Sequence, residues 1–201
     1  QILIYHTHSQ EGYADSTPGD LNTTVMEVGE YLAEILEKNY GLKVLHHEGT
    51  YDVNDRDHAY SNAEKDIEQL LAENPTIEVV IDLHRDGVAE GTKLVSEVNG
   101  KQVASIMFFN GLSRTTALGD IDYLPNPYIQ DNLAFSFQMQ LTAAEYYPGF
   151  ARPIYLKGYR YNMHFKPKSL LVEVGAQTNT LQEAKDAMEP LADILYKVVA
   201  E

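Results

Sequence analysis

Apolar residues along the first half of the chain alternate between the spacing of strands and that of helices. Short apolar runs at residues 2–5, 42–45 and 77–83 predict buried strands. Apolar residues that recur three and four positions apart predict helices between those strands, at residues 22–39 and 59–73. The connections are long enough for parallel crossovers, so the order strand, helix, strand, helix, strand indicates an open α/β sheet.

The second half of the chain departs from this alternation. Residues 93–109 predict a hairpin in which Asn99 and Gly100 form a type I′ turn, so part of the sheet should be antiparallel. Residues 153–168 are rich in tyrosine and basic side chains and show no clean period. Three further elements are predicted: a helix at 129–146, a strand at 169–174 and a helix at 181–200. We therefore expect an α/β fold with a mixed, mostly parallel sheet and flanking helices.

Length and composition limit the class of protein. The chain has 201 residues, of which 44% are hydrophobic and 22% charged, so it can bury a real core and is neither disordered nor fibrous. No internal repeat or linker divides it, and we expect a single domain over residues 1–201. It begins with Gln1 and then a strand, without an initiator Met or a signal-peptide pattern, which suggests a domain excised from a longer protein.

Charge and residue types exclude several functions. Fifteen Lys and Arg against thirty Asp and Glu give a net charge of −15, which disfavours nucleic acid as a partner. The longest apolar runs fall far short of the ~20 residues that a membrane-spanning helix needs. Because the chain has no cysteine, it has no disulfide, zinc ribbon or thiol nucleophile, and its redox compartment stays open.

Two of the seven histidines lie where a predicted strand ends beside a carboxylate. His8 follows the first strand and is three residues from Glu11, a spacing at which an imidazole and a carboxylate can turn onto one ion. His84 lies in the sequence Asp82-Leu83-His84-Arg85-Asp86, at the end of the strand at residues 77–83. Open α/β sheets bind ligands at the carboxyl ends of their strands, so we expect the two loops to meet.

These residue types are those of a catalytic zinc site. Such a site takes three nitrogen or oxygen ligands from the protein and leaves the fourth position to water, and His8, Glu11 and His84 supply that set. A general base must still take a proton from the water. We assign that role to Glu173, at the end of the apolar run of residues 170–172, because a buried acid needs a partner or a function.

The other histidines are weaker candidates as ligands. His6 is the closest rival of His8, since strand alternation would point both the same way, unless it orients a ligand instead. His164 lies in a basic aromatic loop and is ambiguous. Three more are expected at the surface or beside the ligands: His46, His47 and His58.

Four motifs occur in a fixed order along the chain. They are His6-Thr7-His8-Ser9-Gln10-Glu11, Val28-Gly29, Asp82-Leu83-His84-Arg85-Asp86 and Leu171-Val172-Glu173-Val174-Gly175. Together they resemble the stage II sporulation protein P family over nearly the whole chain. That family is similar to the zinc-dependent N-acetylmuramoyl-L-alanine amidases, so the resemblance implies their fold, a twisted mixed sheet flanked by helices.

The resemblance also implies roles for individual residues. In those amidases His, Glu and His hold the metal and a Glu late in the chain is the base, and His8, His84 and Glu173 match three of these positions. The Glu ligand does not transfer: the amidases have it in the first helix, where this sequence offers Glu27 or Glu30, but no carboxylate falls at the aligned position near Leu21 and Asn22. Glu11 is our preferred substitute, since its spacing from His8 resembles the His-x-x-Glu pair of metallocarboxypeptidases, and Glu27 is the alternative.

The activity that the resemblance implies is peptidoglycan hydrolysis. The family is similar to enzymes that cleave the amide between N-acetylmuramic acid and L-alanine, and endopeptidase cleavage of cross-linking peptides is a second activity to test. The implied location is between the mother-cell and forespore membranes during engulfment, with an N-terminal membrane anchor expected outside this sequence. The implied partners are peptidoglycan, a companion lytic transglycosylase and a membrane scaffold.

One residue and one segment are candidates for binding the substrate. Arg85 could pair with a stem-peptide carboxylate, or it could tie down Asp82 or Asp86. The tyrosines and basic residues between Tyr155 and Tyr161 could receive sugar or peptide, or they could form a solvated strand edge.

Two alternatives to the amidase stay open. A zinc metallocarboxypeptidase would use the same metal and would need an Arg or Asn/Arg pocket for a free C-terminal carboxylate. An inactive wall-binding module would keep the fold without the activity. A glycosidase is disfavoured, because the carboxylates cluster with histidines and form no evident acid pair.

Overall fold

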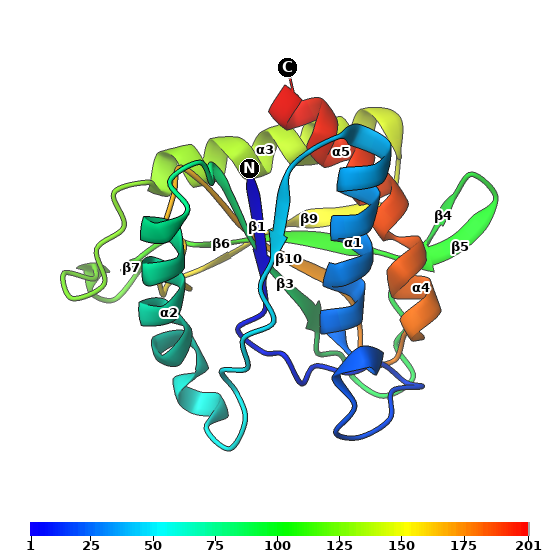
Figure 1. Ribbon diagram of the computed structural model, residues 1–201, viewed down its shortest axis with the longest axis horizontal. Helices are drawn as coiled ribbons and strands as arrows, with labels where there is room; N and C mark the ends of the chain where they lie inside the picture. The colour runs from blue at the N-terminus through cyan, green and yellow to red at the C-terminus, as the bar shows by residue number, and fades with distance from the viewer. Residues whose placement is uncertain (201) are drawn as a thin grey trace.

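The computed structural model of the protein describes residues 1–200 and is built around a six-stranded sheet with the order β2-β1-β3-β10-β6-β9 (Figure 1). In that order the strands are β2 (Val44–His46), β1 (Ile2–Tyr5), β3 (Val79–Asp86), β10 (Lys168–Ala176), β6 (Ile106–Gly111) and β9 (Ala151–Lys157). The first four are parallel to one another, whereas β6 and β9 run together in the opposite direction. The predicted mixed, mostly parallel sheet is therefore confirmed.

Helices cover both faces of the sheet. They are α1 (Val25–Tyr40), α2 (Ala59–Glu73), α3 (Ile129–Tyr146), α4 (Leu181–Asp186) and α5 (Met188–Ala200), with 3-10 turns η1 (Leu21–Thr23) and η2 (Arg56–His58). Figure 1 shows α2 on one side of the sheet and α1, α4 and α5 on the other. Residues of α1, α3 and α5 share one hydrophobic core, whereas α2 closes a smaller second core.

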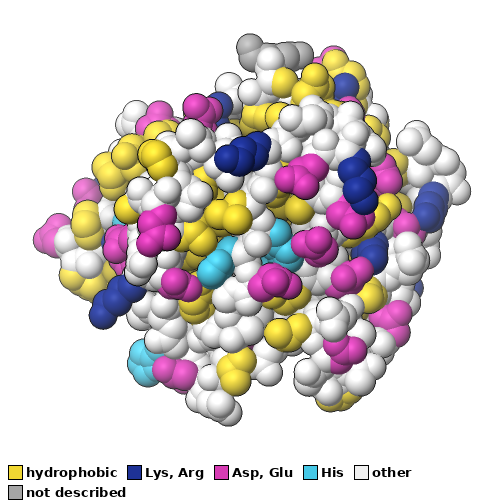
Figure 2. All heavy atoms as spheres, in the orientation of Figure 1, with side chains coloured by type: hydrophobic (Ala, Val, Ile, Leu, Met, Phe, Trp, Pro, Cys, Tyr) yellow, Lys and Arg dark blue, Asp and Glu magenta, His cyan; other side chains and the backbone are white. Residues whose placement is uncertain are grey.

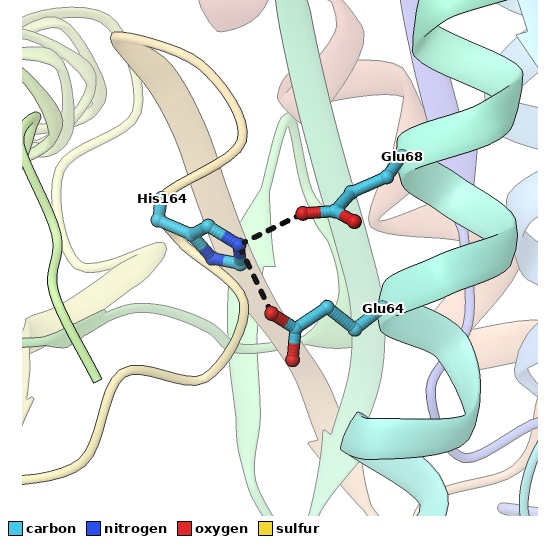
Figure 3. A group of neighbouring side chains, drawn as sticks. All are labelled: Glu64, Glu68 and His164. Atoms are coloured by element: carbon cyan, nitrogen blue, oxygen red, sulfur yellow. Dashed lines mark ion pairs between the residues drawn. The ribbon is translucent and has the colours of Figure 1, made fainter. Parts of the chain in front are cut away.

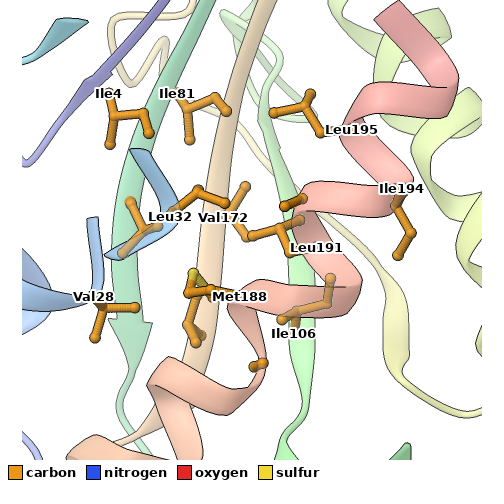
Figure 4. Packing of buried hydrophobic residues seen from close by; sticks show 14 of the residues in the cluster. Ile4, Val28, Leu32, Ile81, Ile106, Val172, Met188, Leu191, Ile194 and Leu195 are labelled. Atoms are coloured by element: carbon orange, nitrogen blue, oxygen red, sulfur yellow. The ribbon is translucent and has the colours of Figure 1, made fainter. Parts of the chain in front are cut away.

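The larger core fixes how the helices lie on the sheet. Figure 4 shows Leu32 of α1 and Leu191 of α5 beside Val172 of β10, and each of these side chains is at most 1% exposed. Burying an aliphatic side chain of this size contributes roughly 1.5–3 kcal/mol. The apolar spacing that predicted the helices is thus the spacing of their contacts with the sheet.

Alternation along β3 decides which of its side chains face α2. Ile81 and Leu83 lie in the larger core, whereas Val80 lies in the smaller one. Successive side chains of a strand point to opposite faces, so Asp82 and His84 share the side of Val80. The polar residues at the end of β3 therefore lie on the α2 face of the sheet.

The predicted hairpin at residues 93–109 is confirmed only in its first part. β4 (Val95–Val98) and β5 (Lys101–Ala104) pair around Asn99 and Gly100, whose φ angles of 52° and 77° are positive, as a type I′ turn requires. The chain then leaves the hairpin, and β6 enters the main sheet, where it is buried along its whole length. The apolar side chains of β6 gain more by burial between β10 and β9 than they would by extending the exposed hairpin.

Two other elements differ from the prediction. β9 lies within the stretch that showed no period, because this edge strand is largely half-buried or exposed and mixes apolar with basic residues. The helix predicted at 181–200 is divided into α4 and α5 around Ala187. Pro190 gives the reason, since its ring clashes with the carbonyl four residues earlier and it has no N–H to donate. Between β6 and α3, β7 (Arg114–Thr115) and β8 (Gly119–Asp120) form a separate two-stranded antiparallel sheet.

The surface reflects the acidic composition. Figure 2 shows carboxylate side chains spread over one face of the molecule, with histidine side chains near its middle and fewer basic groups between them. Among residues 1–200, no helix combines the length and the apolar character that crossing a membrane requires.

Gly29 of α1 lies against two histidine rings and has no room for a side chain. A Cβ at this position would lie 2.5 Å from His6 Nε2 and 2.9 Å from His46 Nε2. The two ring nitrogens are themselves 2.9 Å apart, in hydrogen-bonding distance. The missing side chain therefore lets α1 approach the ends of β1 and β2 closely.

We expect Gly29→Ala to destabilise the protein in urea unfolding. Overpacking costs about 1–3 kcal/mol, whereas the gain in helix propensity is at most about 1 kcal/mol. Lys38→Ala, at an exposed position of the same helix, is the control and should change the free energy of unfolding by less than about 0.5 kcal/mol. Unchanged or increased stability of Gly29→Ala would contradict the close approach.

Candidate metal centre

The end of β3, the loop after β1 and the strand β10 bring polar side chains together on the α2 face. His84 pairs in register with Glu173 of β10. The loop after β1 places the ring of His8 5.5 Å from the ring of His84, between centroids, and Glu11 Oε2 3.3 Å from His84 Nδ1. His84 thus lies beside both other predicted ligands, in contact with Glu11 and edge-on to the ring of His8, and the predicted base is its strand neighbour.

The two imidazoles have nitrogen atoms that suit a metal ion. His8 Nδ1 is buried, lies 3.9 Å from Asp52 Oδ2, and has no hydrogen-bond partner among residues 1–200. His84 Nδ1 faces Glu11, while its other ring nitrogen, Nε2, lies 2.8 Å from Asp82 Oδ1. A buried nitrogen without a partner is costly, and a bound cation would supply the partner that His8 Nδ1 lacks.

Asp82 holds His84 in place, a role that the sequence did not predict. Thr7 donates to this carboxylate twice, from its backbone N–H at 2.9 Å and from its hydroxyl at 2.6 Å. Burial raises the pKa of Asp82, but the His84 imidazole and the hydrogen bonds from Thr7 outweigh burial and lower it. The ionised carboxylate on Nε2 orients the ring and leaves Nδ1 toward Glu11.

Glu11 is buried and ionised. Its Oε1 accepts a hydrogen bond from Arg56 Nη2 at 2.9 Å, and its Oε2 accepts one from the backbone N–H of Arg85 at 3.1 Å. Burial raises the pKa of Glu11, but His84 and the Arg85 N–H outweigh burial and lower it to about 2. Glu11 therefore carries a negative charge for a cation across the neutral range.

Glu173 has the opposite electrostatics. Burial raises its pKa to about 7; His84 opposes this shift, and the nearby carboxylates of Glu11 and Asp86 add to it. Its Oε2 is buried without a hydrogen-bond partner in the described part of the chain. A carboxyl group with this pKa can both accept and return a proton near neutral pH.

Two residues between β2 and α2, Asp52 and Arg56, complete the site, and no sequence pattern predicted either of them. Asp52 is buried and accepts hydrogen bonds from Ser9 Oγ at 2.8 Å and from Gln10 N at 3.2 Å. Arg56 spans two carboxylates, Glu11 at 2.9 Å and Asp52 at 3.7 Å. Both residues lie in a polar segment without helix or strand periodicity, and their contacts reach back to the loop after β1.

Glu27, the alternative third ligand, has another partner. It lies in the first turn of α1 and forms an ion pair with Lys185 Nζ of α4 at 2.5 Å. Glu11, in contrast, contacts His84 directly. The geometry favours Glu11.

His6 does not point in the direction of His8. Its ring is fully buried, with Nδ1 2.8 Å from the carbonyl oxygen of Leu83 and Nε2 2.9 Å from His46 Nε2. Alternation fails here because β1 ends at Tyr5 and the chain turns before His8. Burial, together with the neighbouring His46, lowers the pKa of His6 to about 3. The neutral ring therefore ties the end of β1 to the backbone of β3.

The remaining histidines have carboxylate partners of their own. The pairs are His46 with Glu30 at 2.8 Å, His47 with Asp66 at 3.2 Å and His58 with Asp55 at 2.7 Å. These partners agree with the expectation that the three histidines are not ligands.

His164 belongs to a second group of metal-ligand type, with Glu64 and Glu68 of α2 (Figure 3). One ligand atom of each lies within 4.8 Å of the others, and His164 Nε2 is 3.3 Å from Glu64 Oε1. The guanidinium of Arg160 contacts that same carboxylate oxygen. Because Glu68 is exposed and Arg160 is paired with Glu64, we interpret the group as an ion-pair network that joins α2 to the loop between β9 and β10.

Arg85 borders a cavity of about 330 Å³ beside the loop after β1. Its guanidinium donates to the carbonyl oxygens of Gly12 at 2.7 Å and Asp86 at 3.1 Å. The carboxylates considered as its partners have others: Asp82 is held by Thr7, and Asp86 by Arg152 at 2.8 Å. The backbone contacts fix the guanidinium at the cavity wall.

Comparison with known families decides where the chain belongs. The family model described as stage II sporulation protein P (SpoIIP) matches residues 1–196. The chain is a member of the SpoIIP family. A curated relative, stage II sporulation protein P of Bacillus subtilis (strain 168), is 23% identical over 215 residues, which cover 98% of this chain and 50% of that protein. The SpoIIP-family chain thus spans about half the length of that relative.

Solved structures share the fold of this SpoIIP-family chain. The CwlD amidase from Clostridioides difficile, in complex with the GerS lipoprotein, has a TM-score of 0.61 at 11% identity, covering 100% of this chain and 98% of that one. The catalytic domain of CwlV, an N-acetylmuramoyl-L-alanine amidase from Bacillus (Paenibacillus) polymyxa var. colistinus, has a TM-score of 0.58 at 13% identity, covering 99% and 97%. At these identities the likeness concerns the fold, and the expected amidase-like architecture is confirmed.

Zinc affinity should distinguish the two candidate third ligands. We expect Glu11→Gln to weaken Zn²⁺ binding by at least about 10-fold, because it removes the ionised oxygen that faces His84. Glu27→Gln is the matched control and should bind zinc like the wild type, since its carboxylate is paired with Lys185. Competition with a chromophoric chelator measures both affinities. A loss confined to Glu27→Gln would contradict Glu11 as the ligand.

Proposed function

We propose that this chain is the catalytic domain of a zinc-dependent peptidoglycan hydrolase that cleaves the amide between N-acetylmuramic acid and L-alanine. The observation that carries the proposal is the meeting of His8, Glu11 and His84 beside Glu173 at the carboxyl end of the sheet. Membership of the SpoIIP family and an amidase-like fold support it.

The donor set fits zinc. Two imidazole nitrogens and one carboxylate are ligands of the type that catalytic zinc sites use, with a fourth position left for water. The buried Nδ1 of His8 has no hydrogen-bond partner within residues 1–200, and Glu11 stays ionised. Zinc bound there would polarise the amide carbonyl and lower the pKa of its water to about 7.

Glu173 moves the proton in the proposed reaction. It accepts a proton from the water whose oxygen attacks the amide carbon. When the carbon–nitrogen bond breaks, Glu173 returns that proton to the nitrogen of the departing L-alanine. The raised pKa of Glu173 suits both transfers. Asp82 meanwhile keeps the His84 ring in one orientation.

Arg85 gives the substrate a second point of attachment. Its cavity is also lined by Gln10, Gln177 and the carboxylate of Asp20, so a peptide entering it meets one guanidinium, two amides and one acidic group. A guanidinium matches a carboxylate in geometry and charge, and the stem peptide of peptidoglycan carries free carboxylates. In the proposal this cavity receives the peptide side of the cleaved bond.

The wider biological setting is part of the proposal. The family name supports a role in sporulation, and we place the chain in forespore engulfment, between the mother-cell and forespore membranes. A membrane anchor outside this sequence, a companion lytic transglycosylase and a membrane scaffold are the proposed associates. Endopeptidase cleavage of cross-links is a proposed second activity. The net charge of −15 argues against nucleic acid as a partner.

A zinc metallocarboxypeptidase is the second candidate. The His-x-x-Glu spacing of His8 and Glu11 and the position of Arg85 favour it, because such an enzyme binds a free C-terminal carboxylate beside its metal. The products separate the two reactions, since a carboxypeptidase releases single residues and an amidase releases whole stem peptides.

Digestion of purified peptidoglycan, analysed by mass, tests the reaction. With Zn²⁺ we expect wild type to release intact stem peptides with a free N-terminal alanine, and a chelator should abolish release. Glu173→Gln should lower kcat by about 10²–10⁴-fold while binding zinc like the wild type. Glu97→Gln, on the exposed hairpin, is the matched control and should leave kcat unchanged. Zinc-loaded wild type that cleaves nothing would indicate a wall-binding module instead.

The role of Arg85 predicts a dependence on substrate charge. Arg85→Gln should raise KM about 10–100-fold for stem peptides with free carboxylates, because a hydrogen bond to a charged group contributes about 1.5–3 kcal/mol. It should have little effect on the same substrate with those carboxylates amidated. Equal losses on both substrates would show that Arg85 acts only by holding the backbone at Gly12.

A further inference from the structure

A cavity of about 240 Å³ lies on the other side of the metal centre, between the start of α2 and the loop after β9. Its walls include three tyrosines, Tyr60, Tyr159 and Tyr161, together with Leu124 and Asn162. We call it the tyrosine pocket. We propose that the tyrosine pocket binds a neutral saccharide ring, and, resting on the function proposed above, that this ring belongs to the glycan strand of the substrate.

Tyr60 lies between the tyrosine pocket and the metal centre and contacts both. The Tyr60 ring stacks on His84 with an interplanar angle of 10° and 6.4 Å between centroids. It also meets His8 edge-on at 5.6 Å and Tyr161 edge-on at 5.2 Å. A ligand held against the far side of Tyr60 therefore lies one ring away from two of the proposed zinc ligands.

The backbone of the pocket is strained and fixed. Tyr161 and Asn162 are consecutive residues in the left-handed region, with φ of 50° and 53°. This conformation costs Tyr161 roughly 1–2 kcal/mol, whereas asparagine adopts it more readily. The side-chain amide of Asn162 donates to the carbonyl oxygen of Tyr60 at 2.7 Å, which joins the loop to α2. Such strain persists where the surroundings hold it, and it is typical of ligand sites.

Gly111 of β6 lets this loop lie directly on the sheet. A Cβ at Gly111 would come within 2.5 Å of the backbone oxygens of Tyr159 and Arg160. The N–H of Gly111 also contacts Met163 Sδ at 3.0 Å. The pocket wall is thus held from beneath, and its tyrosines are positioned before a ligand arrives.

The charged groups around the pocket are already paired, which decides the chemistry of its ligand. The Arg160 side chain is buried, contacts Glu64 and donates to the carbonyl oxygen of Pro125 at 3.4 Å. His164 and Glu68 complete the same network (Figure 3). Since Arg160 is committed to Glu64, and the side-chain N–H of Asn162 to Tyr60, the pocket offers aromatic faces and hydroxyls instead of a free cation. A carboxylate-bearing peptide finds its counter-charge at Arg85, whereas this pocket suits a neutral ligand.

A saccharide ring matches the remaining groups. The C–H faces of a pyranose are apolar and pack against aromatic rings, while its hydroxyl and N-acetyl groups hydrogen-bond to tyrosine hydroxyls and amides. Tyr159 is 57% exposed although large and aromatic, so its ring is free to cover a sugar. The two cavities then divide the substrate, with peptide on the Arg85 side, glycan on the Tyr60 side and the scissile amide between them.

Calorimetry with the neutral tetramer of N-acetylglucosamine tests the pocket on the zinc-loaded protein. We expect Tyr159→Ala to weaken binding about 5–10-fold, the loss of one aromatic contact. Tyr146→Ala is the matched control, because Tyr146 is similarly exposed, at 52%, but lies on α3. It should bind the tetramer like the wild type. Because Tyr159 is exposed, its removal should leave the thermal midpoint unchanged, which excludes unfolding as the cause.

The outcomes separate this inference from the proposed reaction. Wild type that does not bind the tetramer, equal binding by Tyr159→Ala, or displacement of the tetramer by a free stem peptide would each overturn the saccharide site. None of these results requires cleavage. A protein that binds the tetramer through Tyr159 but releases no stem peptide would keep the saccharide site and overturn the amidase.

Discussion

One buried carboxylate, that of Asp82, determines whether this site exists. It accepts two hydrogen bonds from Thr7 at the end of β1 and lies 2.8 Å from the ring of His84, two residues further along β3. Burying a charge costs several kcal/mol unless nearby groups compensate it. Here the compensation comes from two strands, so it is complete only when β1 and β3 pair with Tyr5 opposite Asp82. The register of the sheet, the orientation of His84 and the path of the loop that carries His8 therefore depend on one another.

Three carboxylates near one another have been given different tasks by their surroundings. Glu11 and Asp82 contact His84 and hydrogen-bond donors, which lower their pKa values despite burial. Glu173 shares the burial without a comparable set of donors, and its pKa rises to about 7. Groups whose environments push their pKa values apart can act as fixed charges and as a proton carrier in the same site. The fold places Glu173 on β10, opposite His84, and Glu11 on the loop after β1, where Arg56 donates a hydrogen bond to it.

The sequence predicted what depends on local patterns. Apolar runs and helical spacing predicted the first three strands and the helices α1 and α2, and composition predicted α3. Polar residues at strand ends pointed to His8 and His84. It could not predict Asp52 and Arg56, because their partners Ser9 and Glu11 lie 43 and 45 residues away and no period marks the loop between them. The predicted direction of the His6 side chain was wrong for a related reason: side chains alternate only within a strand, and β1 ends at Tyr5. β9 had no period to define it, because an edge strand with exposed side chains has no buried face, so a solvated strand edge was only one of two interpretations of Tyr155 to Tyr161.

The proposed function requires a protein with a net charge of −15 to accept a polymer that carries carboxylates. Screening in solution limits the reach of surface charges to roughly 8–10 Å, so the groups lining each cavity matter more than the total. Arg85, fixed at its cavity wall by backbone oxygens, presents a guanidinium beside the metal centre. On the opposite side Arg160 is neutralised by Glu64, and tyrosines line the cavity. The acidic surface is therefore compatible with the proposed substrate: one cavity presents the Arg85 guanidinium and the other presents tyrosines without a free cation. In the proposal, this difference would give a polymer of sugar and peptide a single direction across the site.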